Sequence, residues 1–261
     1  MSDIALSITD VRLSFGGVHA LDGVNYDVPA GQIVGIIGPN GAGKTTLFDC
    51  ISGFRKPDSG SIILTTPDGP VDLVQQPPWR RTSLGVGRTF QNARMFRSLS
   101  LMDILRTVQH DSMKHSGFFR SVLGFGGARR DEADVRRNAE EALDLVGLLP
   151  HADKPAQELS TGMLRLCELA AVIAVKPKVL LLDEPSSGIA QAETEALAPL
   201  LRQVAEHLGA TMLLIEHDMP MIMKLSDTIV AMAAGKVITA GDPDAVRHHP
   251  EVLTSYLGQS A

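Results

Sequence analysis

A glycine-rich segment, Gly38–Thr45, constrains the fold of this chain more than any other feature of its sequence. It consists of a glycine, four further residues and then Gly-Lys-Thr, a pattern typical of loops that bind phosphate. An apolar run that predicts a buried strand, Gln32–Ile37, comes before it, and a helical run, Lys44–Gly53, follows. In such a strand, loop and helix, successive backbone N–H groups and the positive end of the helix surround a polyphosphate. The segment therefore predicts an α/β fold with a phosphate-binding loop.

Two side chains at the end of this segment have predicted roles of their own. Lys44 would reach the β and γ phosphates of a nucleotide, and the Thr45 hydroxyl would coordinate Mg²⁺. The structural alternative is a glycine turn before a helix that carries a lysine, and the placement between strand and helix makes it the weaker interpretation. The predicted nucleotide-binding residues of this segment are Gly38, Pro39, Asn40, Gly41, Ala42, Gly43, Lys44, Thr45 and Thr46.

Two carboxylates, Asp183 and Glu184, follow a second apolar run, Val179–Leu182. Parallel strands present ligands at their carboxyl ends, so we expect this acid pair to lie beside the phosphate loop. Asp183 would then belong to the Mg²⁺ shell, and Glu184 would accept a proton from an attacking water or orient it. His217 follows the strand run Thr211–Ile215 and is expected at the same sheet edge. Alone, each would be an ordinary solvated or structural feature, but beside the phosphate loop they predict a metal ligand and a base.

The rest of the chain alternates between strand and helix signals, with one helical stretch in the middle. Strand signals nearly vanish between Ser98 and Pro155, and residues 116–130 form a glycine-bearing segment that we expect to be a surface loop. The sequence predicts an N-terminal antiparallel β region, a helical insertion and a parallel α/β core. The remaining predicted elements are strands at Ile4–Phe15 and Val24–Val28, hairpins at Ser61–Leu73 and Thr228–Ala240, helices at Asp131–Val146, Glu193–Leu208 and Asp218–Leu225, and a helical tail that ends at Leu257.

Net charge, apolar runs and cysteine content narrow the classes of function that this chain could have. The net charge of −6 argues against a general nucleic-acid binder, and it disfavours direct binding to an anionic membrane surface. Apolar runs such as Leu169–Val175 are far shorter than the ~20 residues of a spanning helix. The segment Met1–Ala5 lacks the features of a secretory signal, so we expect a cytosolic protein. The two cysteines, Cys50 and Cys167, have no CxxC spacing and are predicted to be reduced and buried.

An ordered set of further motifs resembles the ATP-binding subunits of ABC transporters, and the resemblance covers essentially the whole chain. The segment Leu159–Met163, Leu-Ser-Thr-Gly-Met, resembles the family signature Leu-Ser-Gly-Gly-Gln. Gln91 in Thr-Phe-Gln-Asn resembles the family's Q-loop, and Phe15 sits where its adenine-stacking aromatic occurs. The stretch Ser187–Ala190 resembles the D-loop, and His217 resembles the switch histidine.

This resemblance implies a single nucleotide-binding domain with ATP and Mg²⁺ as its cofactors. Its ATP-binding core would comprise residues 1–97 and 176–261, and its helical subdomain residues 98–175. In the family, each ATP lies between the phosphate loop of one subunit and the signature of the other, so Ser160 and Gly162 would contact a γ-phosphate bound to the partner. The implied catalytic residues are Lys44, Gln91, Glu184 and His217. Further implied contacts to the nucleotide come from Phe15, Gln91, Ser160, Gly162 and Asp183. The implied Mg²⁺ ligands are Thr45, Gln91 and Asp183.

The chain departs from the family pattern at three positions. Thr161 replaces a signature glycine, Met163 replaces the signature glutamine, and Ala190 replaces the usual D-loop Asp or Asn. Each change loses a polar or close-approach contact expected at the dimer interface.

Three stretches resemble one subgroup, the ATPases of importers for branched-chain and other hydrophobic amino acids, and in related systems for urea or amides. They are Arg88–Phe96, Ile215–Met219 and Ala240–Arg247, the last followed by Tyr256-Leu-Gly. This subgroup implies two multi-spanning permeases, a second ATPase subunit in a hetero- or homodimer and, indirectly, an extracytoplasmic solute-binding protein, with no nucleic acid. It places the chain on the inner face of the cell membrane through the permeases.

Three alternatives remain at this stage. The ATPase of lipopolysaccharide export resembles this chain in its core. A soluble ABC ATPase of translation or DNA repair would be expected to show a second cassette or a coiled-coil insertion, and the sequence has neither. A phosphate-loop kinase of small molecules would need a substrate lid, and it would not need Ser160, Gly162 or His217. None of the motifs names the transported solute.

Overall fold

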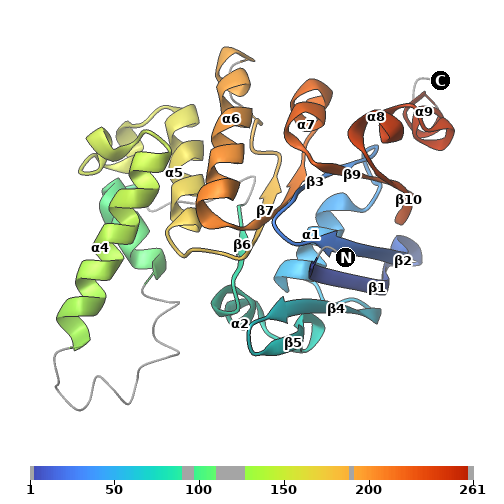
Figure 1. Ribbon diagram of the computed structural model, residues 1–261, viewed down its shortest axis with the longest axis horizontal. Helices are drawn as coiled ribbons and strands as arrows, with labels where there is room; N and C mark the ends of the chain where they lie inside the picture. Colours follow the sequence, from blue (N-terminus) through green and yellow to red (C-terminus); the bar gives the residue numbers. More distant parts are fainter. Residues whose placement is uncertain (1–2, 90–96, 110–126, 188–190, 258–261) are drawn as a thin grey trace.

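The computed structural model describes residues 3–89, 97–109, 127–187 and 191–257. They form two sheets with helices between and beside them (Figure 1). The smaller sheet is antiparallel, has the strand order β2-β1-β4-β5 and comes from the N-terminal part of the chain. Its strands are β1 (Ile4–Phe15), β2 (Val18–Pro29), β4 (Ser59–Thr66) and β5 (Gly69–Asp72).

The larger sheet has six strands in the order β10-β9-β3-β8-β7-β6. Five of them run parallel, and the edge strand β10 is antiparallel to β9. The strands are β3 (Ile33–Ile37), β6 (Val86–Arg88), β7 (Val179–Asp183), β8 (Thr211–Ile215), β9 (Thr228–Ala233) and β10 (Lys236–Gly241). All five residues of β3, β7 and β8 are buried, because helices or strands cover both faces of this sheet.

Alternation along the central strands divides the core into two clusters. In β7, Leu180 and Leu182 face a cluster that also contains residues of α5 (Thr161–Ile173), α6 (Gln191–Leu208) and α7 (Met219–Leu225). Leu181 faces the opposite cluster, to which α1 (Lys44–Ser52) and the antiparallel sheet contribute. Helix α1 therefore lies between the two sheets, and Phe48 on it is fully buried.

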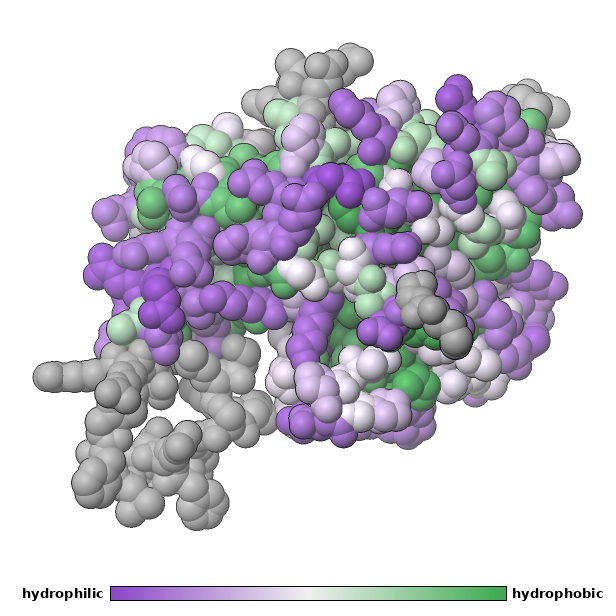
Figure 2. Space-filling view, in the orientation of Figure 1, coloured by the Kyte–Doolittle hydropathy of each residue, from purple (hydrophilic) through white to green (hydrophobic). Residues whose placement is uncertain are grey.

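The remaining helices lie around this core. Residues 101–109 are helical and, with α4 (Gly127–Leu145) and α5, form the left part of the molecule in Figure 1. The short helix α2 (Pro78–Ser83) precedes β6, and α8 (Pro243–Arg247) and α9 (Pro250–Leu257) end the described chain. Among the described helices none is long and apolar enough to span a membrane. Figure 2 shows a face on which polar residues predominate and apolar ones are scattered.

The predicted α/β fold with a parallel sheet and an N-terminal antiparallel sheet is confirmed. The predicted start of the central helix at Asp131 is wrong, since α4 already begins at Gly127, where alanine and arginine favour helix. The second strand is longer than expected because β2 continues through Gly23, which has φ 79° beside an irregular register with β1. Both cysteines are buried and free, as expected. The domain boundaries stay a prediction, and most of the predicted loop at 116–130 lies outside the described residues.

Candidate functional site

The predicted phosphate loop connects β3 to α1, as the sequence required. Gly38, Gly41 and Gly43 have φ angles of 152°, 81° and 99°, which favour glycine. Gly43 is the N-cap of α1, and no side chain caps this helix end. The first amides of α1 therefore remain available as hydrogen-bond donors at the positive end of the helix, which suits a phosphate.

Neighbouring backbone holds the loop from two sides. A Cβ on Gly38 would lie 2.2 Å from the Met232 carbonyl oxygen, and one on Gly43 would lie 2.4 Å from the Ala20 oxygen. The amide of Gly235, in the turn between β9 and β10, donates to the Ala42 oxygen at 3.1 Å. Strand β2 and the hairpin of β9 and β10 thus fix the shape of the phosphate loop. Larger residues at Gly38 or Gly43 would displace the loop.

Lys44 lies inside the loop with only 7% of its surface exposed. Its Nζ donates to the carbonyl oxygens of Gly38 at 2.6 Å and Pro39 at 3.1 Å. Burial lowers the pKa of Lys44, while the charges of Glu184 and Asp183 oppose that shift. The structure thus brings the lysine and the acid pair together, as the sequence predicted.

Asp183 is the last residue of β7 and is buried. Burial raises the pKa of its carboxyl group, and the positive charge of Arg88 opposes this. Its Oδ2 accepts a hydrogen bond from Arg88 Nη2 at 3.3 Å, whereas the buried Oδ1 has no partner among the described residues. A buried carboxylate oxygen that is otherwise unsatisfied fits a magnesium site.

The protein offers only part of a coordination shell. No group of three or more His, Cys, Asp or Glu side chains in the described part of the chain could hold a metal ion. Thr45, exposed in the first turn of α1, adds a hydroxyl. This donor set fits Mg²⁺, which usually takes one or two protein oxygens and completes its shell with phosphate oxygens and water.

Glu184 and His217 meet at the ends of β7 and β8. His217 Nε2 lies 2.9 Å from Glu184 Oε1, and an ionised carboxylate only accepts, so the imidazole donates. Glu184 has φ 51°, in the left-handed region that few non-glycine residues adopt, while its amide donates to the Ile215 oxygen at 2.9 Å. The backbone thereby turns sharply after the strand and directs the Glu184 side chain toward His217.

A buried carboxylate beneath these loops, Glu216, was missed by the sequence reasoning. It accepts hydrogen bonds from the amides of Ser186 at 2.8 Å and His217 at 2.9 Å. One side chain therefore joins the loop after Glu184 to the loop that carries His217. Its position between a buried strand and His217 was the available signal.

The signature residues lie elsewhere in the subunit. Ser160 caps α5, where its Oγ accepts from the Met163 amide at 3.3 Å. Ser160 is exposed and Gly162 is half-buried. Figure 1 shows α5 well apart from α1, so the structure does not bring Ser160 and Gly162 to the phosphate loop of the same chain.

Phe15 lies at the end of β1 and is 43% exposed. The Arg55 guanidinium lies 5.3 Å from the centre of its ring. Phe15 pairs with Val18 across the hairpin, close to the Ala20 carbonyl that faces Gly43. The ring is therefore held on the hairpin that contacts the phosphate loop. Gln91 and Ala190 lie outside the described residues.

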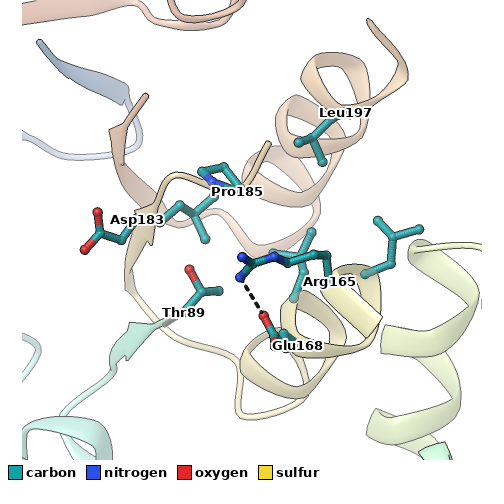
Figure 3. Close-up of a pocket in the computed structure, with 9 residues that line it drawn as sticks. Thr89, Arg165, Glu168, Asp183, Pro185 and Leu197 are labelled. Atoms are coloured by element: carbon teal, nitrogen blue, oxygen red, sulfur yellow. Dashed lines mark hydrogen bonds and ion pairs between the residues drawn. The ribbon is translucent and has the colours of Figure 1, made fainter. Parts of the chain in front are cut away.

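A small cavity of about 20 Å³ lies behind the acid pair, between α5, β7 and α6 (Figure 3). Arg165 Nη1 and Glu168 Oε2 form an ion pair at 3.2 Å in its wall, and burial raises the pKa of Glu168 while Arg165 opposes the shift. Figure 3 shows the Asp183 carboxylate pointing away from this pair. The cavity has room for about one water molecule, so it is no nucleotide site.

The sequence profile of the ABC transporter family matches residues 21–187. The chain is 37% identical over 260 residues to the high-affinity branched-chain amino acid transport ATP-binding protein LivG of Escherichia coli K12. It is 36% identical to BraF of Pseudomonas aeruginosa, which has the same description. Each match covers 100% of both chains. Among solved structures, MJ1267, an ATP-binding cassette of an ABC transporter in its ADP conformation, superposes with a TM-score of 0.80 at 27% identity, and the match covers 98% of this chain and 100% of that one.

Proposed function

The chain belongs to the ABC transporter family as an ATP-binding, ATP-hydrolysing subunit, and from this premise we propose that it drives an importer of branched-chain or related hydrophobic amino acids. The observation that carries the choice of solute class is the match to LivG over the whole of both chains. That match favours an importer over the lipopolysaccharide-export alternative. The profile match and the position of His217 argue against a small-molecule kinase.

We infer the following roles in hydrolysis. The amides at the start of α1 and the Lys44 ammonium bind the β and γ phosphates. Thr45 and Asp183 would hold Mg²⁺, which would offset charge on the phosphate oxygens. Glu184 accepts the proton of the attacking water, and His217 holds the Glu184 carboxylate in place through the 2.9 Å hydrogen bond. Phe15 stacks against the nucleotide base.

The separation of the signature from the phosphate loop supports a composite site in a dimer. Ser160 and Gly162 sit at the start of α5 and are at least partly exposed. A second ATPase subunit would present its own α5 to this chain's nucleotide, and this chain would do the same in return. A closed dimer would exclude bulk water and align the one attacking water molecule with Glu184.

We propose that a permease contacts this chain at the end of α1 that lies far from the phosphate loop. Phe54 and Trp79 are large apolar side chains that are 56% and 54% exposed. Trp79 is on α2, two residues before the buried Arg81, whose guanidinium donates to the carbonyl oxygens of Cys50 and Ile51 and so joins α2 to the end of α1, shortly before Phe54. An apolar permease segment that rests on this pair would be connected to the phosphate loop through α1.

Transport by the reconstituted complex tests this proposal. Proteoliposomes would contain the two permeases and the second ATPase, with the solute-binding protein and labelled leucine added on one side and ATP on the side of this chain. We expect ATP-dependent uptake that unlabelled isoleucine and valine compete away and that sulfate does not affect. Uptake that needs ATP but responds only to urea or amides would correct the solute class. A complex that forms but never couples ATP to uptake would contradict the importer proposal.

A further inference from the structure

Arg88, the last residue of β6, occupies the space between the phosphate-loop helix and the acid pair. Its Nη1 donates to Asp49 Oδ1 at 2.7 Å and to Ser52 Oγ at 2.8 Å, both on α1. Its Nη2 donates to Asp183 Oδ2 on β7 at 3.3 Å. One guanidinium therefore connects the helix that begins with Lys44 to the strand that ends with Asp183.

The surroundings of Arg88 fix its orientation. Its side chain is 7% exposed, and its guanidinium lies 5.8 Å from the centre of the Phe48 ring and 5.9 Å from that of Phe54. A planar group with donors on two sides and aromatic rings against it can turn very little. Asp183, whose side chain is 3% exposed, is held by the same group.

This contact determines which oxygen Asp183 can offer. Arg88 occupies Oδ2, and Oδ1 stays buried without a partner in the part of the chain that the structure describes. A buried carboxylate oxygen without a hydrogen-bond partner is costly unless another group satisfies it. The arrangement thus leaves one defined oxygen of Asp183 for a cation.

We propose that Arg88 is a positioning residue for the metal, which holds the Asp183 carboxylate so that Oδ1 faces Mg²⁺ in the nucleotide complex. The inference rests on the proposed metal role of Asp183 and goes beyond it. Groups that orient a metal ligand in this way typically change metal affinity by roughly 10–100-fold when they are removed. The loss should therefore appear in metal binding and leave metal-free nucleotide binding largely intact.

The experiment measures ATP affinity with and without Mg²⁺ in the Glu184→Gln background, in which hydrolysis is expected to be slow. Mn²⁺ titration followed by electron paramagnetic resonance, with ATP present, reports the metal directly. Arg88→Met keeps the apolar stem and removes all donors, whereas Arg88→Lys keeps the charge but cannot bond both carboxylates in fixed directions. We expect Arg88→Met to weaken Mn²⁺ binding roughly tenfold or more, and Arg88→Lys to recover only part of the loss.

Two further variants separate positioning from general stability. Arg202→Met, on α6 and away from the site, removes an ion pair with Asp227 and should leave the metal dependence unchanged. Asp49→Asn weakens the link to α1 but keeps the Arg88–Asp183 contact, so it should lose much less metal affinity than Arg88→Met.

Several results would overturn the inference. They are wild-type metal affinity in Arg88→Met, an equal loss of ATP binding without metal, and a loss in Asp49→Asn as large as in Arg88→Met. If Arg88→Met does not fold, full metal affinity in Arg88→Lys has the same consequence. A wild-type chain whose ATP binding ignores Mg²⁺ would instead contradict the metal site itself.

Discussion

Glu184→Gln should separate nucleotide binding from hydrolysis in this chain. Glutamine has the same length as glutamate, and its amide oxygen can still accept the hydrogen bond from His217 Nε2, now 2.9 Å from Glu184 Oε1. The side chain is 23% exposed and the backbone conformation at φ 51° is unaffected, so folding should change little. What is lost is the ability to take a proton. Removal of a general base costs 10²–10⁴-fold in rate, or about 3–5 kcal/mol of transition-state stabilisation.

Single-turnover hydrolysis of labelled ATP measures this loss, and equilibrium binding of Mg-ATP shows that the site is otherwise intact. Glu206→Gln, an exposed change of the same kind on α6, is the matched control and should hydrolyse ATP like the wild type. If Glu184→Gln turned over ATP at nearly the wild-type rate, Glu184 would not be the base. If it lost ATP binding as well, the carboxylate would hold the loop or the metal.

Other perturbations test the remaining parts of the site. Lys44→Ala should abolish ATP binding, because the lysine supplies the fixed charge beside the β and γ phosphates; near wild-type affinity by calorimetry would contradict the phosphate loop. Phe15→Ala should weaken ATP and GTP binding similarly, since stacking carries no hydrogen-bond code for the base, and an ATP preference that survives the change would mean that other residues read it. Arg81→Met should lower the free energy of unfolding by about 2–4 kcal/mol in urea titrations, because it leaves buried carbonyl oxygens at the end of α1 unpaired, whereas the exposed Arg80→Met should not. The purified chain should be mostly monomeric with slow basal ATPase that rises with its partners; a stable homodimer with high turnover would refute a heterodimer.

Strand and loop assignments near the phosphate loop could be predicted because they depend on local signals. Glycines at the end of a buried strand and carboxylates at the end of another strand identify the same sheet edge before any contact is known. In the structure, Lys44, Asp183, Glu184 and His217 do lie close to one another at this edge. These four side chains are found from residue type and position alone.

The short elements between residues 73 and 88 could not be predicted in this way. Helix α2 has six residues and β6 has three, too few for a period to be visible. Both exist because of partners distant in the sequence, since β6 pairs with β7 and Arg81 of α2 bonds to α1. Buried arginines such as Arg81 and Arg88 were missed for the same reason, because arginine is usually exposed and only its partners show otherwise.

The signature segment shows what the structure adds to a motif. Met163 stands where the family has glutamine, and it packs against the buried cluster beneath α5. An apolar side chain placed there stabilises α5 but donates nothing across a dimer interface. Thr161 is exposed at the first residue of the helix, directly after the capping Ser160. In the proposed dimer both departures would act on the surface offered to a partner's nucleotide, and neither residue belongs to this chain's own phosphate loop. If a different ATPase completes the dimer, the site formed by this chain's signature should be the weaker one, while the site that contains Lys44 and Glu184 keeps its full strength.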